Sequence, residues 1–139
     1  MDHLSASMKV AASGLDAQSL RLRVVSENLA NAQSTSQIPG GDPYQRKLVN
    51  FQTIFADQVQ GSIVDAHSVS NDTRAFSLEF DPGSPGANAE GYVKMPNVNS
   101  IIEMADMREA NRSYQANLQV FKQARELISL TIDLMRAGQ

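Results

Sequence analysis

The stretch from Asn97 to Gln139 carries apolar side chains at alternating intervals of three and four residues. This spacing is the heptad seam of an α-helix, and a second apolar run lies directly beside it. At about 1.5 Å per residue, such a helix is roughly 65 Å long, and a chain of this length has little else to cover it. The wide apolar face predicts a helical bundle built partly from other chains. The seam and its neighbouring run include Met104, Met107, Tyr114, Leu118, Phe121, Leu127, Ile128, Ile132 and Met135.

A second heptad run extends from about Asp2 to Ala32 and predicts another long helix. Gly14 and several serines are poor helix formers, so this helix needs packing to be stable. Gln18 is the one polar residue of the seam. It either sets the register of a coiled coil, as buried polar residues can, or lies at a partly solvated edge. The apolar seam residues are Leu4, Met8, Leu15, Leu22, Val25 and Leu29.

The middle of the chain predicts irregular and β structure. Proline and glycine exclude regular structure in the loop Gln33–Pro43. Tyr44–Gln60 has apolar spacings that fit either a helix or a strand. Alternating residues in Gly61–Asp81 predict a β-hairpin with its turn at Ser70–Thr73, and Asp81–Pro96 is a second loop.

The C-terminal helix has two kinds of start signal. Ser100 and Glu103 match a capping box, while Asn97 or Asn99 can cap the helix instead. The predicted fold is mainly α with a small β content, with the long terminal helices packed as a coiled coil around a loop and β-hairpin segment. Residues 1–32 and 97–139 form one discontinuous helical domain, and residues 33–96 form the insert.

Composition excludes several classes of function. The net charge is −3 and no region is strongly basic, which argues against nucleic acid as a partner. The absence of cysteine excludes disulfides and thiolate metal sites. No apolar run approaches the ~20 residues of a membrane span, and the N-terminus lacks the features of a cleaved secretory signal.

Catalytic and metal-binding patterns are weak. His3 and His67 have no ligand partner at metal-site spacing, so no metal or cofactor site is expected. Glu103, Asp106 and Glu109 share one helical face. Such carboxylates can serve acid–base catalysis, but they are more typical of a solvated face near the positive end of a helix. We expect the solvated face and no catalytic residues.

Several motifs together resemble the N- and C-terminal signatures of bacterial flagellar rod and hook proteins. They occur in the expected order at opposite ends of the chain, and the small size suits the proximal rod branch of that family. The motifs are Ser26–Ala32, Pro43–Lys47, Asp81–Pro85, Gly91–Asn99, Glu103–Met107 and Arg112–Asn117. Within them, the residues that carry the resemblance most directly are Asn28, Leu29, Ala30, Asn31, Tyr44, Arg112, Tyr114, Gln115 and Asn117.

This resemblance implies an axial structural protein without enzymatic activity or cofactor. Members of the family assemble helically, with the terminal helices forming an inner coiled-coil tube, and leave by the flagellar type III export apparatus without a cleaved signal. The rod crosses the periplasm as a drive shaft. The implied partners are other proximal and distal rod subunits, the rod-to-ring adaptor and the membrane-embedded motor ring.

Two other functions remain open from the residues alone. One is a self-contained helical adaptor in the cytoplasm, which would need no export. The other is an enzyme that uses Glu103 and Asp106.

Overall fold

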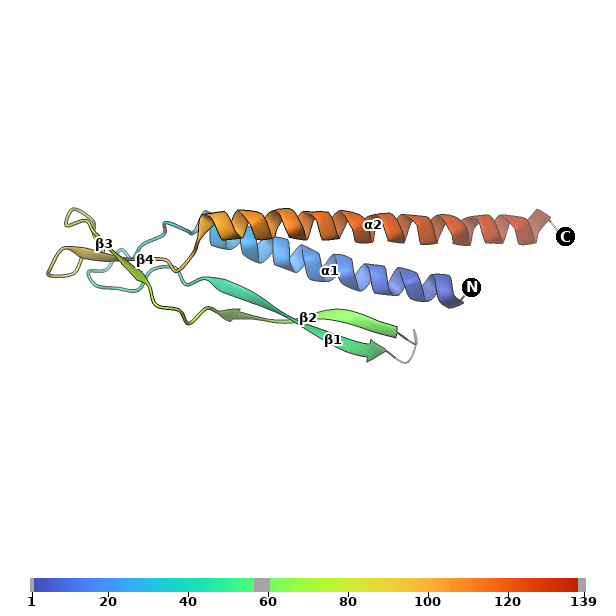
Figure 1. The fold of residues 1–139 in the computed structure, drawn as a ribbon, viewed down its shortest axis with the longest axis horizontal. Coiled ribbons are helices and arrows are strands. Elements are labelled where there is room, and N and C mark those ends of the chain that lie inside the picture. Colours follow the sequence, from blue (N-terminus) through green and yellow to red (C-terminus); the bar gives the residue numbers. More distant parts are fainter. Residues whose placement is uncertain (1, 57–60, 138–139) are drawn as a thin grey trace. The chain divides into compact units, whose positions relative to one another are not determined.

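The computed structural model describes residues 2–56 and 61–137. Within these residues two helices enclose four strands, so the expected mainly helical fold with a small β content is confirmed (Figure 1). No helix in this described part is both long and apolar enough to cross a membrane. The elements are α1 (Asp2–Ala30), β1 (Lys47–Ala56), β2 (Gly61–Asn71), β3 (Ser77–Phe80), β4 (Tyr92–Met95) and α2 (Ser100–Ala137).

Asn99 is the residue that caps α2. Its Oδ1 accepts hydrogen bonds from the backbone N–H groups of Ile101 at 3.0 Å and Ile102 at 3.3 Å. These are two of the N–H groups that a helix start leaves without intrahelical partners. The capping-box alternative does not form, because the Glu103 carboxylate binds other residues.

The predicted hairpin between residues 61 and 81 is wrong in its pairing. β2 pairs with β1, and β3 pairs with β4, in two separate two-stranded sheets. The segment read as a hairpin turn instead ends β2. The Asp72 side chain accepts a hydrogen bond from the Arg74 backbone N–H at 3.0 Å, which is a local side-chain turn. Tyr44–Gln60, where the sequence left helix and strand open, contains β1; residues 57–60 lie outside the described chain.

The small β3–β4 sheet is antiparallel, with Phe80 opposite Tyr92 and Leu78 opposite Lys94. Gly91 enters β4 with a φ of 84°, a conformation that favours glycine. A Cβ at this position would lie 2.9 Å from the Phe80 ring. The chain therefore needs glycine here for both its backbone conformation and the close approach of the ring.

The structure divides into two compact units. The first comprises the described parts of Met1–Leu22, Asn50–Ser68 and Glu109–Gln139. In this unit a Cβ on Gly14 would lie 2.6 Å from the Asn117 side chain, so α1 and α2 approach closely. Its buried apolar residues are Ala11, Ala17, Ala110 and Ala124, all of them small.

The second unit comprises Arg23–Val49 and Val69–Arg108. Its apolar core is equally thin, with Val24, Val25 and Val93 buried. Three polar side chains, Asn28, Asp72 and Glu103, are buried as well. Buried polar groups need partners, and these three residues belong to one polar network that supplies them.

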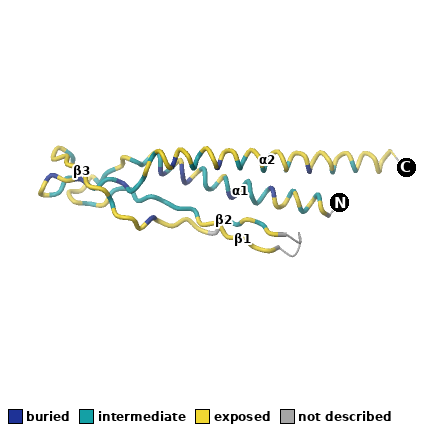
Figure 2. Tube along the Cα trace, in the orientation of Figure 1, coloured by how far each residue is buried: buried dark blue, intermediate teal, exposed yellow. Residues whose placement is uncertain are grey.

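Large seam residues are only partly covered in this chain (Figure 2). In α1, Val25 is buried, while Leu4, Met8, Leu15, Leu22 and Leu29 are half-buried. In α2, the half-buried residues are Met107, Tyr114, Leu118, Phe121 and Ile128, and the exposed residues are Met104, Leu127, Ile132 and Met135. The Oε1 atom of Gln18 is buried without a hydrogen-bond partner in the described structure, which favours a buried polar position over a solvated edge.

Candidate functional site

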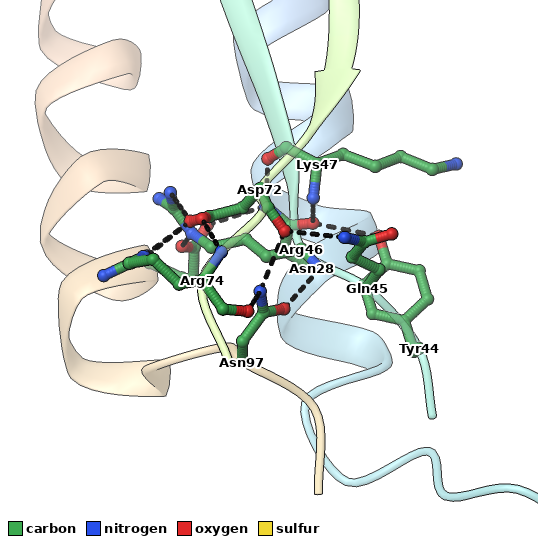
Figure 3. A network of polar contacts seen from close by, with 9 residues as sticks. Asn28, Tyr44, Gln45, Arg46, Lys47, Asp72, Arg74 and Asn97 are labelled. Carbon is green, nitrogen blue, oxygen red and sulfur yellow. Dashed lines mark hydrogen bonds and ion pairs between the residues drawn. The ribbon is translucent and has the colours of Figure 1, made fainter. Parts of the chain in front are cut away.

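Asn28 lies at the centre of a buried polar network in the second unit (Figure 3). Its Nδ2 donates to the Lys47 carbonyl at 2.8 Å and to Glu103 Oε2 at 3.1 Å. Its Oδ1 accepts from the Lys47 N–H and the Tyr44 hydroxyl, both at 2.9 Å. One side chain of α1 thus binds the start of β1 and the first turn of α2.

Glu103 is fully buried, which corrects the expectation of a solvated carboxylate. It lies four residues before Met107 in the half-buried seam of α2, so it faces the interior. The Arg46 guanidinium compensates the buried charge, with Nε at 2.6 Å from Glu103 Oε1. Asp106 is half-buried, and Glu109 is exposed and lies 3.7 Å from Arg21.

Asp72 is the second buried carboxylate and binds two arginines. Its Oδ2 lies 2.6 Å and 2.8 Å from Nη2 and Nε of Arg74, and 3.4 Å from Nη1 of Arg46. The hydrogen bonds from the Arg74 side chain and backbone lower the pKa of Asp72 to about 2. Asp72 therefore stays ionised at any physiological pH, and the two carboxylates balance the two guanidinium groups.

Amide side chains join the strand segments to one another. Asn97 Oδ1 accepts from the Arg46 N–H at 2.8 Å, and its Nδ2 donates to the carbonyls of Asp72 and Arg74 at 3.0 Å and 2.9 Å. Gln45 Nε2 also donates to the Asp72 carbonyl, at 2.8 Å. These contacts satisfy backbone groups at the point where β1 begins and β2 ends.

Tyr44 acts as a hydroxyl donor. Burial of the ring, together with the negative charges of Glu27 and Glu103, raises the pKa of Tyr44 to about 12. The hydroxyl therefore remains protonated and can donate to Asn28. Lys47 forms an ion pair with Glu27 at the edge of the network.

The network positions chain segments rather than performing chemistry. Its charged groups bind one another, and it connects residues of α1, β1, the end of β2 and α2 that are far apart in the sequence. A groove of about 420 Å³ beside it is lined by Arg46, Leu48, Asp72, Arg74, Asn99, Ile102 and Glu103. Among the described residues, no group of His, Cys, Asp and Glu could hold a metal ion; the side chain of His67 lies outside the description.

Sequence reasoning found part of this network. Asn28 and Tyr44 were named as motif residues, and the structure brings them into contact. Among the other motif residues, the half-buried ones include Leu29, Asn31 and Tyr114, and the exposed ones are Ala30, Arg112 and Gln115. The remaining one, Asn117, lies against Gly14. The sequence did not predict the other members of the network as partners of one another. These members are Arg46, Asp72, Arg74, Glu103 and Asn97. One signal was available, because a charged Glu103 in the seam of a helix requires a buried partner.

Comparison with protein-family models places the chain among flagellar rod proteins. Residues 8–36 match the model described as "Flagella basal body rod protein". Residues 89–134 match the model described as "Flagellar basal body rod FlgEFG protein C-terminal". These regions contain most of α1 and most of α2. The matched class is that of flagellar basal body rod proteins.

Three curated relatives specify the branch, and each is called flagellar basal-body rod protein FlgC. The Agrobacterium fabrum protein is 57% identical over 100% of both chains. The Salmonella typhimurium protein is 42% identical over 90% of this chain and 92% of its own, and the Bacillus subtilis protein is 37% identical over 92% and 95%. The chain therefore belongs to the FlgC family of flagellar basal-body rod proteins. It is a structural subunit of the basal body and not an enzyme.

Proposed function

We propose that this chain builds the proximal part of the flagellar rod by helical self-assembly through its terminal helices. The apolar surface that α2 leaves exposed toward its C-terminal end carries this proposal. Leu127, Leu130, Leu134 and Met135 are 50%, 53%, 75% and 51% exposed. Contiguous apolar surface of this kind marks an interaction site.

The N-terminal helix supports the same role. Its deepest positions within the first unit are small residues, Ala11 and Ala17, while larger seam residues such as Leu15 stay half-buried. We infer that residues 1–32 and 97–139 pack as a coiled coil with neighbouring subunits to form an inner tube, and that residues 33–96 form the outer insert. Heterologous contacts that do not close into a ring generate a helical filament.

The polar network supports a mechanical role for the subunit. Directional hydrogen bonds and ion pairs hold the starts of β1 and α2 to the end of α1. In the proposed drive shaft, which transmits motor torque across the periplasm, these contacts resist rotation of the insert against the helices. The proposed neighbours are proximal and distal rod subunits, the rod-to-ring adaptor and the membrane-embedded motor ring.

A substitution on the exposed face of α2 tests the assembly. Leu134→Asp should leave the helical content of the dilute chain unchanged, because this side chain is 75% exposed. It should abolish incorporation into basal bodies and swimming, since it places a charge in the proposed apolar interface. The control is Gln123→Asp, an exposed polar position of the same helix. Normal basal bodies and normal swimming with Leu134→Asp would contradict the proposal.

We also propose delivery by the flagellar type III export apparatus without a cleaved signal. Cells that lack this apparatus should keep the chain in the cytoplasm. In wild-type cells, mass spectrometry of isolated basal bodies should find the N-terminal residues of the sequence intact. A shortened N-terminus, or export in the absence of the apparatus, would contradict this route.

A further inference from the structure

The β3–β4 sheet has an apolar face that nothing in the described chain covers. Leu78, Phe80 and Tyr92 are 62%, 64% and 43% exposed. The register places these three residues on the same side of the sheet, while Val93 on the other side is buried. We call these three residues, together with the acidic neighbours Asp81 and Glu90, the aromatic tip.

The rings of the tip are held in place before any partner binds. Phe80 and Tyr92 contact each other edge to face, with centroids 5.3 Å apart and an interplanar angle of 66°. The Phe80 ring also lies against Gly91 so closely that a Cβ there would be 2.9 Å away. Rigid exposed aromatic side chains lose little entropy on binding, which is typical of interface anchors.

The tip is also acidic. The segment from Ala75 to Val93 contains Glu79, Asp81 and Glu90 and no lysine or arginine. All three carboxylates belong to exposed residues; Asp81 directly follows Phe80, and Glu90 lies two residues before Tyr92. Lys94 lies opposite Leu78 on the same side of the sheet, and its charge is neutralised by Asp42, at 2.7 Å. A partner surface for this tip should therefore be apolar and basic.

The first turns of α2 provide a surface of that chemistry. Ile101, Met104, Arg108 and Arg112 recur at intervals of three and four residues and so form one stripe on the helix. Ile101 and Met104 are 78% and 50% exposed, and both arginines are exposed. Within the described chain neither arginine forms an ion pair. We call these four residues the α2 stripe.

We propose that the aromatic tip of one copy docks on the α2 stripe of a second copy. Leu78, Phe80 and Tyr92 would cover Ile101 and Met104, and the tip carboxylates would face the two arginines. Tip and stripe are different surfaces, so the contact is heterologous and leaves a free tip and a free stripe for further copies. This inference rests on the proposed self-assembly, but apart from Met104 it uses residues outside the apolar seams.

Charge reversal on each surface tests the contact in the full-length chain. The tip variant is Asp81→Arg with Glu90→Arg, and the stripe variant is Arg108→Glu with Arg112→Glu. In sedimentation velocity, each variant alone should associate at least about tenfold more weakly than the parent, because like charges then face each other. An equimolar mixture of the two variants should regain association, since opposite charges meet again. Lys9→Glu with Lys122→Glu, both exposed and outside the stripe, is the matched control and should associate like the parent.

Cysteine trapping locates the contact directly, because the chain has no cysteine of its own. A mixture of Asp81→Cys and Arg108→Cys chains should form a disulfide-linked heterodimer in excess over either homodimer and over a mixture of Asp81→Cys with Gln123→Cys. If the parent associates but neither charge reversal nor trapping shows the contact, this inference is overturned while the assembly proposal stands. If the parent does not associate at any concentration, both are overturned.

Discussion

Replacing Arg46 by Met should destabilise the second unit strongly. Glu103 is fully buried, and the Arg46 guanidinium at 2.6 Å is the cation that compensates it. Removing one partner of a buried ion pair costs about 3–5 kcal/mol, because the other charge stays buried without compensation. The Arg46 side chain is 14% exposed, so water can reach its place and we expect the lower end, about 3 kcal/mol. Asp72 contributes little to this loss, since it keeps its contacts with Arg74.

Hydrogen exchange is the assay for this substitution, because it reports on the network itself. The Lys47 N–H binds Asn28 and the Asp72 N–H binds the Arg46 carbonyl, so both amides lie inside the network. A loss of about 3 kcal/mol corresponds to exchange faster by about two orders of magnitude at these amides. The control Lys47→Met removes an ion pair whose side chains are 35% and 39% exposed. It should cost less than about 1 kcal/mol.

A double substitution tests whether the uncompensated charge of Glu103 causes the loss of stability in Arg46→Met. Adding Glu103→Gln to Arg46→Met removes the uncompensated carboxylate while keeping an oxygen for Asn28. The double variant should be more stable than Arg46→Met alone, with a coupling energy of about 1.5 kcal/mol or more. A loss below about 1 kcal/mol for Arg46→Met, or strictly additive effects in the double variant, would refute the reasoning.

Three further predictions concern neighbouring groups. Asn28→Ala should lower the free energy of unfolding, measured in urea, by about 2–3 kcal/mol, because it leaves buried partners unpaired. The control Asn31→Ala should lower it by less than about 1 kcal/mol, and equal losses would contradict a central role for Asn28. Because the pKa of Asp72 is about 2 instead of 3.8, the stability that its carboxylate contributes is fully present above pH 3.8 and is lost as the pH falls through about 2. Asp72→Asn should remove this acid-dependent loss of stability. An unchanged profile of stability against pH would count against this role of Asp72. Because the pKa of Tyr44 is about 12, stability should fall as the pH rises from 10 toward 12; Tyr44→Phe should remove the ultraviolet titration step near 12, and persistence of that step would assign it elsewhere.

The helices could be predicted from the sequence because their signal is local. The alternation of three and four residues repeats along each segment, and α1 ends at Ala30, two residues before the expected Ala32. The family motifs correctly indicated a flagellar rod protein for the same reason, since they are continuous runs of residues. The sequence offers three candidates for the cap of α2, namely Asn97, Asn99 and the Ser100–Glu103 capping box. In the structure Asn99 is the residue that caps the helix.

Strand partners and buried ion pairs could not be predicted because they depend on contacts between distant residues. The alternation in Ser77–Phe80 indicated the strand β3 but not that its partner is Tyr92–Met95. Asp72 is expected only as a turn residue, because its neighbour Arg74 fits a turn and its other partner, Arg46, lies 26 positions away. Glu103 was assigned to solvent because its neighbours suggest a dipole-stabilised face, whereas Arg46, 57 positions away, allows it to be buried.

The long sequence separations within the network also set the order in which this chain can fold. The hydrogen bond from Asn28 to Glu103 joins residues 75 positions apart. Such contacts form late, because the intervening chain must be ordered before they are made. A chain that becomes free to fold from its N-terminus onward can form the α1 helix locally. The contacts that join the end of α1 to β1 and α2 cannot form until nearly all of residues 28–103 are present. The contacts that hold α1, β1 and α2 together in the folded subunit are therefore missing until that point, even though α1 can already be helical.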